Sequence, residues 1–339
     1  MKTKVNRTQL LNSLELASPG LSPREIIEQS SCFVFDGTTV KTYNDEVSCS
    51  VDCNFPVSGA IQATSMMDIL RKLNEDEIGV EDKGAEVVVY GKSRRLGLRK
   101  EQEILLPVAS VDSPGEWSEL PTKFVDAVRL VLSCVSKDES QFALTCVHLH
   151  PKWLEACDNF QLTRYKMPMP GLGEPTLVRG TSIKAVADMA FTRMSLSDNW
   201  IHFTTDDTGV VLSCRRYVEV YPPLEGILKC SGSALTLPKG LGEAAEKAGV
   251  FAGDAIEGSQ VRVQLEANQV RIRGQGATGW YEERKQVTYR GPEMAFLIGP
   301  EVLAEIVKNH SECIVDTESN RMAITGSKFR FVTCLGKVG

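Results

Sequence analysis

The stretch PTKFVDAVRLVLSCV at positions 121–135 carries the pattern that decides the fold. Its apolar residues Phe124, Val128, Val131 and Val135 recur at steps of four, three and four, which predicts a helix with one buried face. Strand-like sequence follows this helix. The same succession of a helix and several strands begins at five other positions, which are Asn6, Ser65, Thr181, Pro238 and Pro300.

The six helix starts are evenly spaced along the chain. Within successive pairs they lie 59, 60 and 62 residues apart. The first members of the pairs are 115 and 117 residues apart, and the second members 116 and 119. Such spacing is typical of an internal structural repeat. We predict three domains, at 1–118, 119–228 and 229–339, each built from two halves that contain one helix and several strands.

Local signals support these helices and the strands between them. Asn6 with Gln9, and Ser65 with Asp68, approximate capping boxes. Alternation of apolar and polar residues predicts hairpins at 200–214, 261–274 and 313–326. Helices on one side of antiparallel sheets, three times over, are an α+β fold. Three prolines suit the first turn of a helix, where a missing N–H costs nothing: Pro121, Pro238 and Pro300.

Composition indicates a cytoplasmic protein without a membrane partner. The chain is 42% apolar and 24% charged, with a net charge of −6, and it contains no apolar run as long as a membrane span. The ten cysteines are scattered singly, which suits core residues in a reducing compartment. Cys49 and Cys53 form the nearest pair, and without a second pair they are a poor zinc signal. We expect no metal and no cofactor.

Two glycine patterns could suggest a nucleotide-binding enzyme. Gly274, Gly276 and Gly279 spell G-x-G-x-x-G, but a strand follows where a dinucleotide site needs a helix. We therefore predict a hairpin turn there, and a structural role for Gly240 and Gly242 before the fifth helix. The sequence contains no G-x-S-x-G, H-E-x-x-H or P-loop motif. It predicts a protein without a catalytic site.

A family resemblance lies in the middle unit. Residues 124–149 place a helix and the run V-S-K-D-E-S before a strand, and residues 154–162 read L-E-A-C-D-N-F-Q-L. This arrangement resembles the second domain of the bacterial sliding clamps, the beta subunits of DNA polymerase III. In that family the helix ends in V-S-x-D-E-x-R-x-x-L-x-G-V, and the stretch A-T-D-G-H-R-L follows the next strand.

The resemblance extends to the rest of the chain. Residues 1–5 are similar to the first strand of the clamps, 91–96 to their G-R-S-R-F hairpin, 221–223 to their F-P-D-Y linker, and 294–338 to their last helix, hairpin and tail. Clamps of this family are head-to-tail homodimers that encircle double-stranded DNA without reading its sequence. The resemblance therefore implies a ring that holds DNA topologically.

The resemblance also implies residues that contact DNA. Arg24 stands where family members have an arginine that contacts DNA. However, the net charge of the six helix segments, counted from their Lys, Arg, Asp and Glu residues, is −1. The helices are therefore not basic as a group. For all candidates other than Arg24, a solvated surface position explains the residue equally well. These further candidates are Arg7, Lys123, Arg129, Lys184 and Arg193.

A second implied site is a pocket between domains two and three, where polymerase and clamp loader insert a short peptide of the Q-L-x-L-F type. For Leu144 and Leu162, a position in the hydrophobic core is as good an explanation as a position in the pocket wall. Two departures bear on peptide preference: the family's G-H-R is Asn159-Phe160-Gln161 here, and the tail differs from M-P-M-R-L. The wall implied by the resemblance consists of Leu144, Cys157, Asn159, Phe160, Leu162, Pro222, Gly226, Ile227, Val332, Cys334, Leu335 and Val338.

For the dimer, we predict that an edge strand near Leu106 to Val111 pairs with one near Val250 and Phe251 of the second copy. Three functions stay open: a processivity clamp, a clamp-fold scaffold or repair ring without polymerase binding, and an unrecognised enzyme. Divergence of this degree would suit a clamp encoded by a phage or plasmid.

Overall fold

The computed structural model describes residues 2–206, 209–253 and 259–338. The chain divides into two compact units. Unit 1 runs to Leu154 and continues with Met167–Val220, and unit 2 comprises Glu155–Lys166 and the chain from Tyr221 onward. The first division falls within β11 (Trp153–Cys157). The three domain boundaries expected from the repeat stay a prediction.

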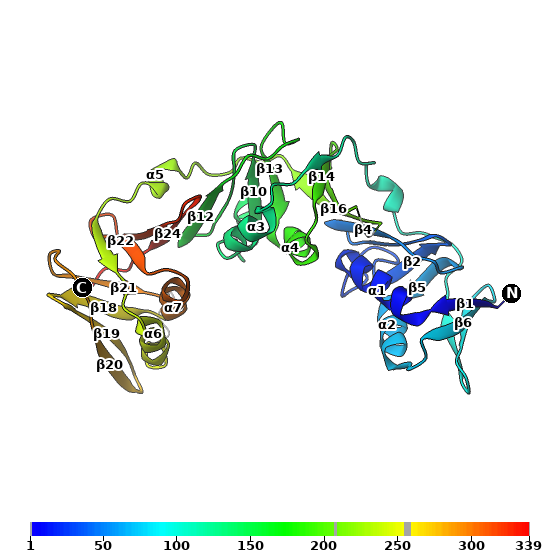
Figure 1. The fold of residues 1–339 in the computed structure, drawn as a ribbon, viewed down its shortest axis with the longest axis horizontal. Coiled ribbons are helices and arrows are strands. Elements are labelled where there is room, and N and C mark those ends of the chain that lie inside the picture. Colours follow the sequence, from blue (N-terminus) through cyan, green and yellow to red (C-terminus); the bar gives the residue numbers. More distant parts are fainter. Residues whose placement is uncertain (1, 207–208, 254–258, 339) are drawn as a thin grey trace. The chain divides into compact units, whose positions relative to one another are not determined.

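All six predicted helices are confirmed, and antiparallel sheets fill the sequence between them (Figure 1). The α+β class is therefore confirmed. The structure adds one short helix, α5 (Glu225–Leu228), that the repeat did not predict. The six predicted helices are α1 (Arg7–Ala17), α2 (Ala63–Lys72), α3 (Phe124–Leu132), α4 (Gly180–Met189), α6 (Leu241–Gly249) and α7 (Pro300–Asn309).

The helix starts differ in detail from the prediction. The Asn6 side chain accepts a hydrogen bond from the Gln9 N–H at 2.9 Å, as a cap should. The Ser65 cap is wrong, because α2 begins two residues earlier and Gln62 caps it. Pro300 lies in the first turn of α7.

The other two prolines, Pro121 and Pro238, were wrongly placed inside helices. Each lies three residues before its helix, and its carbonyl accepts a hydrogen bond from the first helical residue, Phe124 or Leu241. These prolines shape the turn that leads into the helix.

Unit 1 contains two antiparallel sheets. One has the strand order β1-β6-β7-β8. The other has the order β10-β13-β16-β4-β3-β2-β5. In this second sheet β16 also pairs with β15, β15 pairs with β14, and β14 pairs with β9. The strands of the first sheet are β1 (Thr3–Asn6), β6 (Glu77–Asp82), β7 (Glu86–Tyr90) and β8 (Arg95–Arg99). Those of the second are β2 (Cys32–Asp36), β3 (Thr39–Tyr43), β4 (Val47–Asp52), β5 (Ser58–Gln62), β9 (Ser118–Glu119), β10 (Cys146–His150), β13 (Thr176–Arg179), β14 (Arg193–Leu196), β15 (Trp200–Thr204) and β16 (Val210–Tyr217).

Unit 2 repeats the arrangement with the orders β17-β22-β23-β24-β12 and β20-β19-β18-β21. Helix α6 lies against one face of the second sheet, and α7 packs on α6 (Figure 1). The strands are β12 (Gln161–Lys166), β17 (Ser233–Thr236), β18 (Val261–Glu266), β19 (Gln269–Gly276), β20 (Gly279–Gln286), β21 (Met294–Ile298), β22 (Glu312–Asp316), β23 (Arg321–Thr325) and β24 (Phe329–Cys334). The three predicted hairpins are confirmed as β15–β16, β18–β19 and β22–β23.

The glycine motif is a hairpin, as predicted. Gly276 pairs with Gly279 where β19 turns into β20. Gly274 lies against α6, and a Cβ at this position would overlap the Ala248 carbonyl. Gly240, with φ 79°, is the residue from which α6 starts. These glycines serve strand packing and turns.

The structure also shows where the cysteines lie and whether a helix could cross a membrane. All ten cysteines are free thiols, and nine are buried, with Cys334 exposed, so the prediction of core cysteines holds for nine of them. No helix among the described residues is long and apolar enough to cross a membrane.

A buried histidine in unit 1 makes stability depend on pH. His202 has no exposed surface, and its ring nitrogens lie 3.0 Å from Ser197 Oγ and 2.8 Å from Ser213 Oγ. Burial lowers the pKa of His202 to about 4. Because the unfolded chain binds this proton more readily, stability is present above the ordinary histidine pKa and is lost as the pH falls.

Acidification from pH 7 to pH 5 is therefore expected to lower the free energy of unfolding by about 2 kcal/mol through His202. Chemical denaturation at both pH values measures this loss. In a His202→Gln variant the same pH change should cost less, because glutamine does not titrate. Equal pH dependence in the two proteins would show that other groups set it.

Candidate functional site

Two of the predicted DNA-contacting side chains are available for a ligand. Arg24 is exposed in the loop before β2, and Lys184 is exposed on α4. Within the described part of the chain, no carboxylate lies within ion-pair distance of either side chain. Both are therefore free to contact phosphate groups, as far as their own chain is concerned.

The other four candidates have partners within the protein. The Arg7 guanidinium donates to the carbonyls of Glu75 and Leu70 at 2.8 and 3.2 Å. Arg129 donates to the Ala187 carbonyl in α4 at 2.8 Å. Each arginine thus satisfies backbone carbonyls in or just after the last turn of a neighbouring helix.

The remaining two pair with carboxylates. Lys123 lies 3.1 Å from Asp126, where both side chains are exposed, and Arg193 pairs with Asp206. An exposed pair holds a side chain only weakly, so Lys123 can still exchange its partner. Of the six candidates, the structure leaves Arg24 and Lys184 as the ones without a competing contact.

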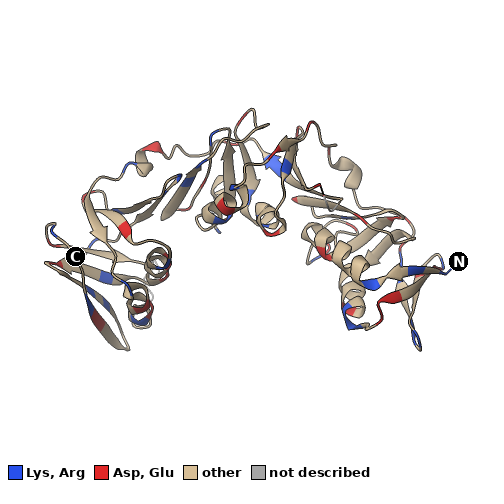
Figure 2. Cartoon of the chain, in the orientation of Figure 1, with Lys and Arg blue, Asp and Glu red and all other residues tan. Residues whose placement is uncertain are grey.

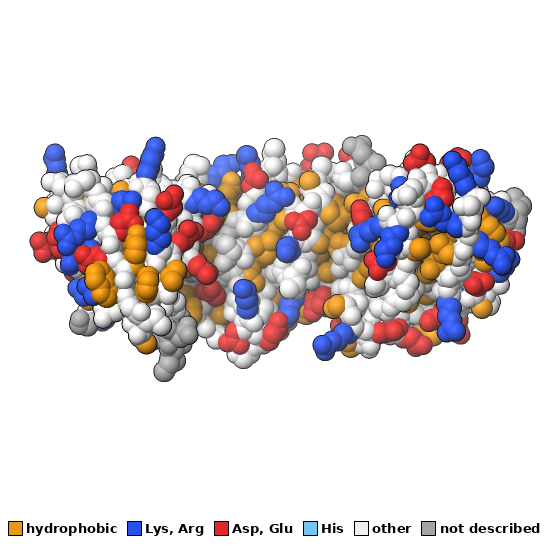
Figure 3. Space-filling view, turned by 90° about the horizontal axis from the view of Figure 1, so that it is seen from below, with side chains coloured by type: hydrophobic (Ala, Val, Ile, Leu, Met, Phe, Trp, Pro, Cys, Tyr) orange, Lys and Arg blue, Asp and Glu red, His pale blue; other side chains and the backbone are white. Residues whose placement is uncertain are grey.

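Charge on the six helices agrees with the sequence count. They carry seven Lys or Arg and eight Asp or Glu residues. Both signs occur on the helices of each unit (Figure 2). Seen from below, basic and acidic side chains are interspersed (Figure 3). Any contact of these helices with a nucleic acid therefore depends on individual side chains.

The predicted peptide pocket separates into buried and accessible residues. Leu144 and Leu162, for which a core position was the alternative, are both buried. Cys157, Val332 and Leu335 are buried as well. These five cannot form a freely accessible wall. The other residues are accessible at least in part, and they are Asn159, Phe160, Pro222, Gly226, Ile227, Cys334 and Val338.

The accessible candidates of unit 2 lie on connected elements. The Cys334 N–H donates to the Phe160 carbonyl at 2.7 Å, which joins the end of β24 to the turn before β12. Leu162 pairs with Val332 in the adjoining strands. Phe160 is 55% exposed and Ile227 is 36% exposed, so both offer apolar surface. Single exposed apolar residues are common, but a pair on connected elements is a candidate contact surface.

Arginines fix the short helix α5 that carries Gly226 and Ile227. Arg164 pairs with Glu225 at 2.9 Å and with the buried Glu155 at 2.6 Å. Arg330 donates to the carbonyls of Leu228 and Cys230 at 2.8 and 3.0 Å. These contacts hold α5 against β12 and β24.

A cavity of about 410 Å³ adjoins α5. Its wall includes Arg164, Glu225, Leu228, Phe329 and Arg330, and none of the twelve predicted residues. Sequence reasoning missed these arginines, because their partners lie far away in the sequence.

Tyr221 is a further residue that the prediction left out. Its hydroxyl accepts a hydrogen bond from the Cys157 N–H at 2.9 Å and donates to the Cys157 sulfur at 3.4 Å. Burial raises the pKa of Tyr221 far above its usual range, so the phenol stays protonated. The sequence signal that could have identified Tyr221 is its place as the aromatic residue at the start of the linker Tyr221-Pro-Pro223. It anchors the linker on β11.

The predicted edge strand near Leu106 to Val111 is wrong. This segment contains a 3-10 turn at Val108–Ser110. Leu106 is 3% exposed and packs in a core cluster with Trp200, and Val111 packs against the same cluster. Gln29 accepts hydrogen bonds from the N–H groups of Leu105 and Leu106, which leaves no open strand edge there. Val250 is 76% exposed, whereas Phe251 is only partly exposed.

End strands lie elsewhere, and β8 in unit 1 and β20 in unit 2 are two of them, each at one end of its sheet. Gly91 N–H donates to the Arg94 carbonyl, and Lys100 N–H to the Ala85 carbonyl, both at 2.9 Å. Because antiparallel pairs alternate, the backbone groups of Arg95, Gly97 and Arg99 point away from β7. By the same alternation, the outward groups of β20 belong to Trp280, Glu282, Arg284 and Gln286.

No metal site is apparent from the donor groups. Among the described residues, no three or more His, Cys, Asp or Glu side chains are arranged to hold a metal ion.

Comparisons with known proteins give a consistent result for the fold. No protein-family model matches the chain, and no curated protein matches its sequence. Solved structures match it over its full length. A DnaN sliding clamp (DNA polymerase III subunit beta) from Bartonella birtlesii has a TM-score of 0.88 at 16% identity, and that from Pseudomonas aeruginosa 0.86 at 16%. A DNA polymerase III beta subunit from Thermotoga maritima has a TM-score of 0.85 at 17% identity.

In all three comparisons the match covers 100% of this chain and 100% of the other. At this level of identity the likeness concerns the arrangement of the backbone. It agrees with the resemblance read from the sequence, and it includes both units. The chain therefore has the fold of the bacterial DNA polymerase III beta sliding clamps.

Proposed function

We propose that the protein is a DNA sliding clamp: a homodimeric ring that encircles double-stranded DNA and tethers a DNA polymerase, without catalysing a reaction itself. The observation that carries this proposal is the likeness in fold to solved sliding clamps over the whole chain. A fold alone does not fix a function, so the proposal needs support from the site.

Three features support it. Open strand edges at β8 and β20 offer backbone groups for pairing with a second copy. Arg24 and Lys184 are available for phosphate contacts. The balanced helix charges suit a protein held on DNA by its shape, since topological retention needs few strong contacts.

Retention on DNA tests the proposal. Protein loaded onto nicked circular DNA by a clamp loader is expected to stay bound in moderate salt and to leave once the DNA is linearised, because a ring slides off an end without breaking its contacts. Gel filtration of the DNA before and after cutting measures this. Equal salt-resistant retention on linear and circular DNA would contradict encirclement.

The alternative is a clamp-fold scaffold or repair ring that binds no polymerase. The observation in its favour is that five of the twelve residues predicted for the peptide pocket are buried. Such a ring would show the same topological retention on DNA and would not bind a polymerase peptide. Binding of a polymerase peptide at the surface around Phe160 and Ile227 therefore distinguishes the two functions.

A further inference from the structure

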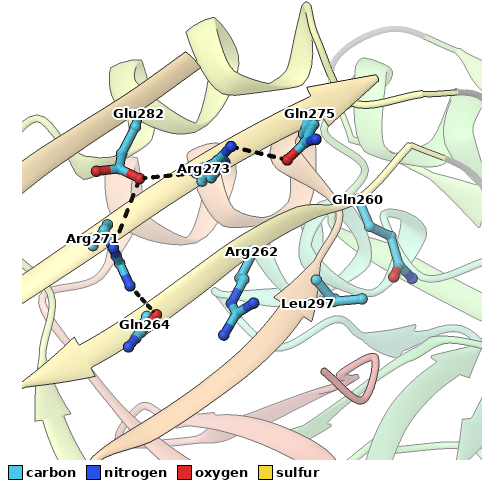
Figure 4. Close-up of a pocket in the computed structure, with 8 residues that line it drawn as sticks. All are labelled: Gln260, Arg262, Gln264, Arg271, Arg273, Gln275, Glu282 and Leu297. Atoms are coloured by element: carbon cyan, nitrogen blue, oxygen red, sulfur yellow. Dashed lines mark hydrogen bonds and ion pairs between the residues drawn. The ribbon is translucent and has the colours of Figure 1, made fainter. Parts of the chain in front are cut away.

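The outer face of the sheet β20-β19-β18-β21 carries more arginines than carboxylates. Alternate residues of its strands, such as Val263 and Ile272, point into the core under α6 and α7. The residues between them form a cavity of about 400 Å³ on the opposite face (Figure 4). Its wall includes Arg262, Arg271, Arg273, Glu282, Gln264 and Gln275.

Carboxylates do not balance the arginines of this face. Glu282 is shared by Arg284, Arg273 and Arg271 at 3.3, 3.6 and 3.9 Å. Glu266 adds one contact to Arg271, at 3.8 Å. No carboxylate among the described residues pairs with Arg262. Four arginines thus face two carboxylates, on a chain whose net charge is −6.

Strand register also sets like charges opposite each other. Arg262 is directly opposite Arg273, and Arg271 is directly opposite Arg284. Like charges in such positions destabilise a sheet. The Nε atom of Arg273 is, in addition, buried without a hydrogen-bond partner among the described residues. Glu282, directly opposite Arg273, offsets part of this repulsion, and an anion between the arginines would relieve the rest.

We propose that this face binds an acidic segment of a partner protein, in extended form and with Asp or Glu at alternate positions. Arg271 and Arg273 are two residues apart on β19, a spacing on the order of 7 Å, which equals the spacing of alternate side chains in an extended peptide. Guanidinium groups also match carboxylates in geometry.

The contacts left to a ligand are mainly those of the guanidinium groups. The side-chain oxygens of Gln264 and Gln275 already accept hydrogen bonds from Arg271 and Arg273, and the Gln264 amide donates to Glu266. Trp280 is 60% exposed beside Arg273, whose guanidinium lies 5.1 Å from the ring centre, so apolar side chains also find a contact. This inference does not depend on the proposed function.

Binding of a designed peptide tests the inference. The probe is a fluorescein-labelled ten-residue peptide that alternates Ser and Glu, and its counterpart alternates Ser and Gln. Fluorescence anisotropy with the full chain should show binding of the Glu peptide only. The affinity should fall as salt is added, since the contacts are between exposed charges.

Arg262→Gln is expected to weaken binding of the Glu peptide about tenfold, as loss of one charge-assisted hydrogen bond implies. Lys137→Gln removes the same charge from an exposed position in unit 1 and should leave binding unchanged. Thermal unfolding checks the fold independently: Arg262→Gln should melt no lower than the unaltered protein, because it removes a like-charge neighbour of Arg273.

Three results would overturn the inference. The first is equal binding of the Glu and Gln peptides. The second is equal loss of affinity in Arg262→Gln and Lys137→Gln, which would mean that only net charge matters. The third is tighter binding of a ten-nucleotide single-stranded DNA that Arg262→Gln abolishes, which would assign the face to nucleic acid.

Discussion

An Arg99→Pro protein is expected to sediment as a monomer at concentrations where the unaltered protein is a dimer. The Arg99 N–H points away from β7, so proline at this position leaves the sheet of unit 1 intact. It removes one donor from the open edge, and its ring keeps a second strand at a distance. Loss of two or more ladder bonds, ~3 kcal/mol in all, lowers dimer affinity about a hundredfold.

The matched control is Arg99→Ala, which removes the same charge and keeps the N–H. Analytical ultracentrifugation across a dilution series should show a dimer for Arg99→Ala and a monomer for Arg99→Pro. If both variants remain dimers, β8 is not the edge that pairs. If the unaltered protein is itself a monomer at all concentrations, the homodimer is wrong.

Val250 offers an independent probe of the second edge. It is 76% exposed just after α6, so an aspartate there does not disturb the interior. Phe251 is a poorer choice than the sequence suggested, because it is partly buried and packs beside Gly279 at the start of β20. A change at Phe251 would therefore alter the hairpin as well as any interface.

The helices and hairpins were predictable because their signals are local. A helix shows its apolar face every three or four residues, as in 124–135, and a hairpin alternates within a few residues. The one misplaced cap, at Ser65, reflects competition between two residues that can both accept a hydrogen bond. Gln62 prevails, three residues before the predicted cap.

The edge strand and the pocket wall were not predictable in the same way, because both depend on contacts between distant residues. Residues 104–111 are apolar enough to suggest a strand. However, the buried Gln29, with φ 63°, hydrogen-bonds the backbone there and ties it to the core. Similarly, Arg7 and Arg129 are basic residues on helices, yet each is bound to a helix about 60 positions away in the sequence.

Ile227→Asp is expected to weaken binding of a leucine- and phenylalanine-containing polymerase peptide roughly thirtyfold or more. Ile227 is 36% exposed on α5, which packs against β24, the strand whose Cys334 N–H donates to the Phe160 carbonyl. A carboxylate placed in a desolvated apolar contact removes about 2 kcal/mol or more of binding energy, or roughly thirtyfold in affinity. Calorimetry with the peptide measures the change, and Phe160→Ala should weaken binding in the same direction.

The control is Ile26→Asp, the same substitution at an isoleucine that is 86% exposed in unit 1. It should leave peptide binding and folding unchanged. Leu162→Asp is unsuitable as a probe, because Leu162 is 3% exposed and a buried carboxylate would destabilise unit 2 itself. If Ile227→Asp and Ile26→Asp bind the peptide equally well, the surface around α5 is not the polymerase contact. The scaffold or repair ring then becomes the better description, because this surface is what separates the two functions.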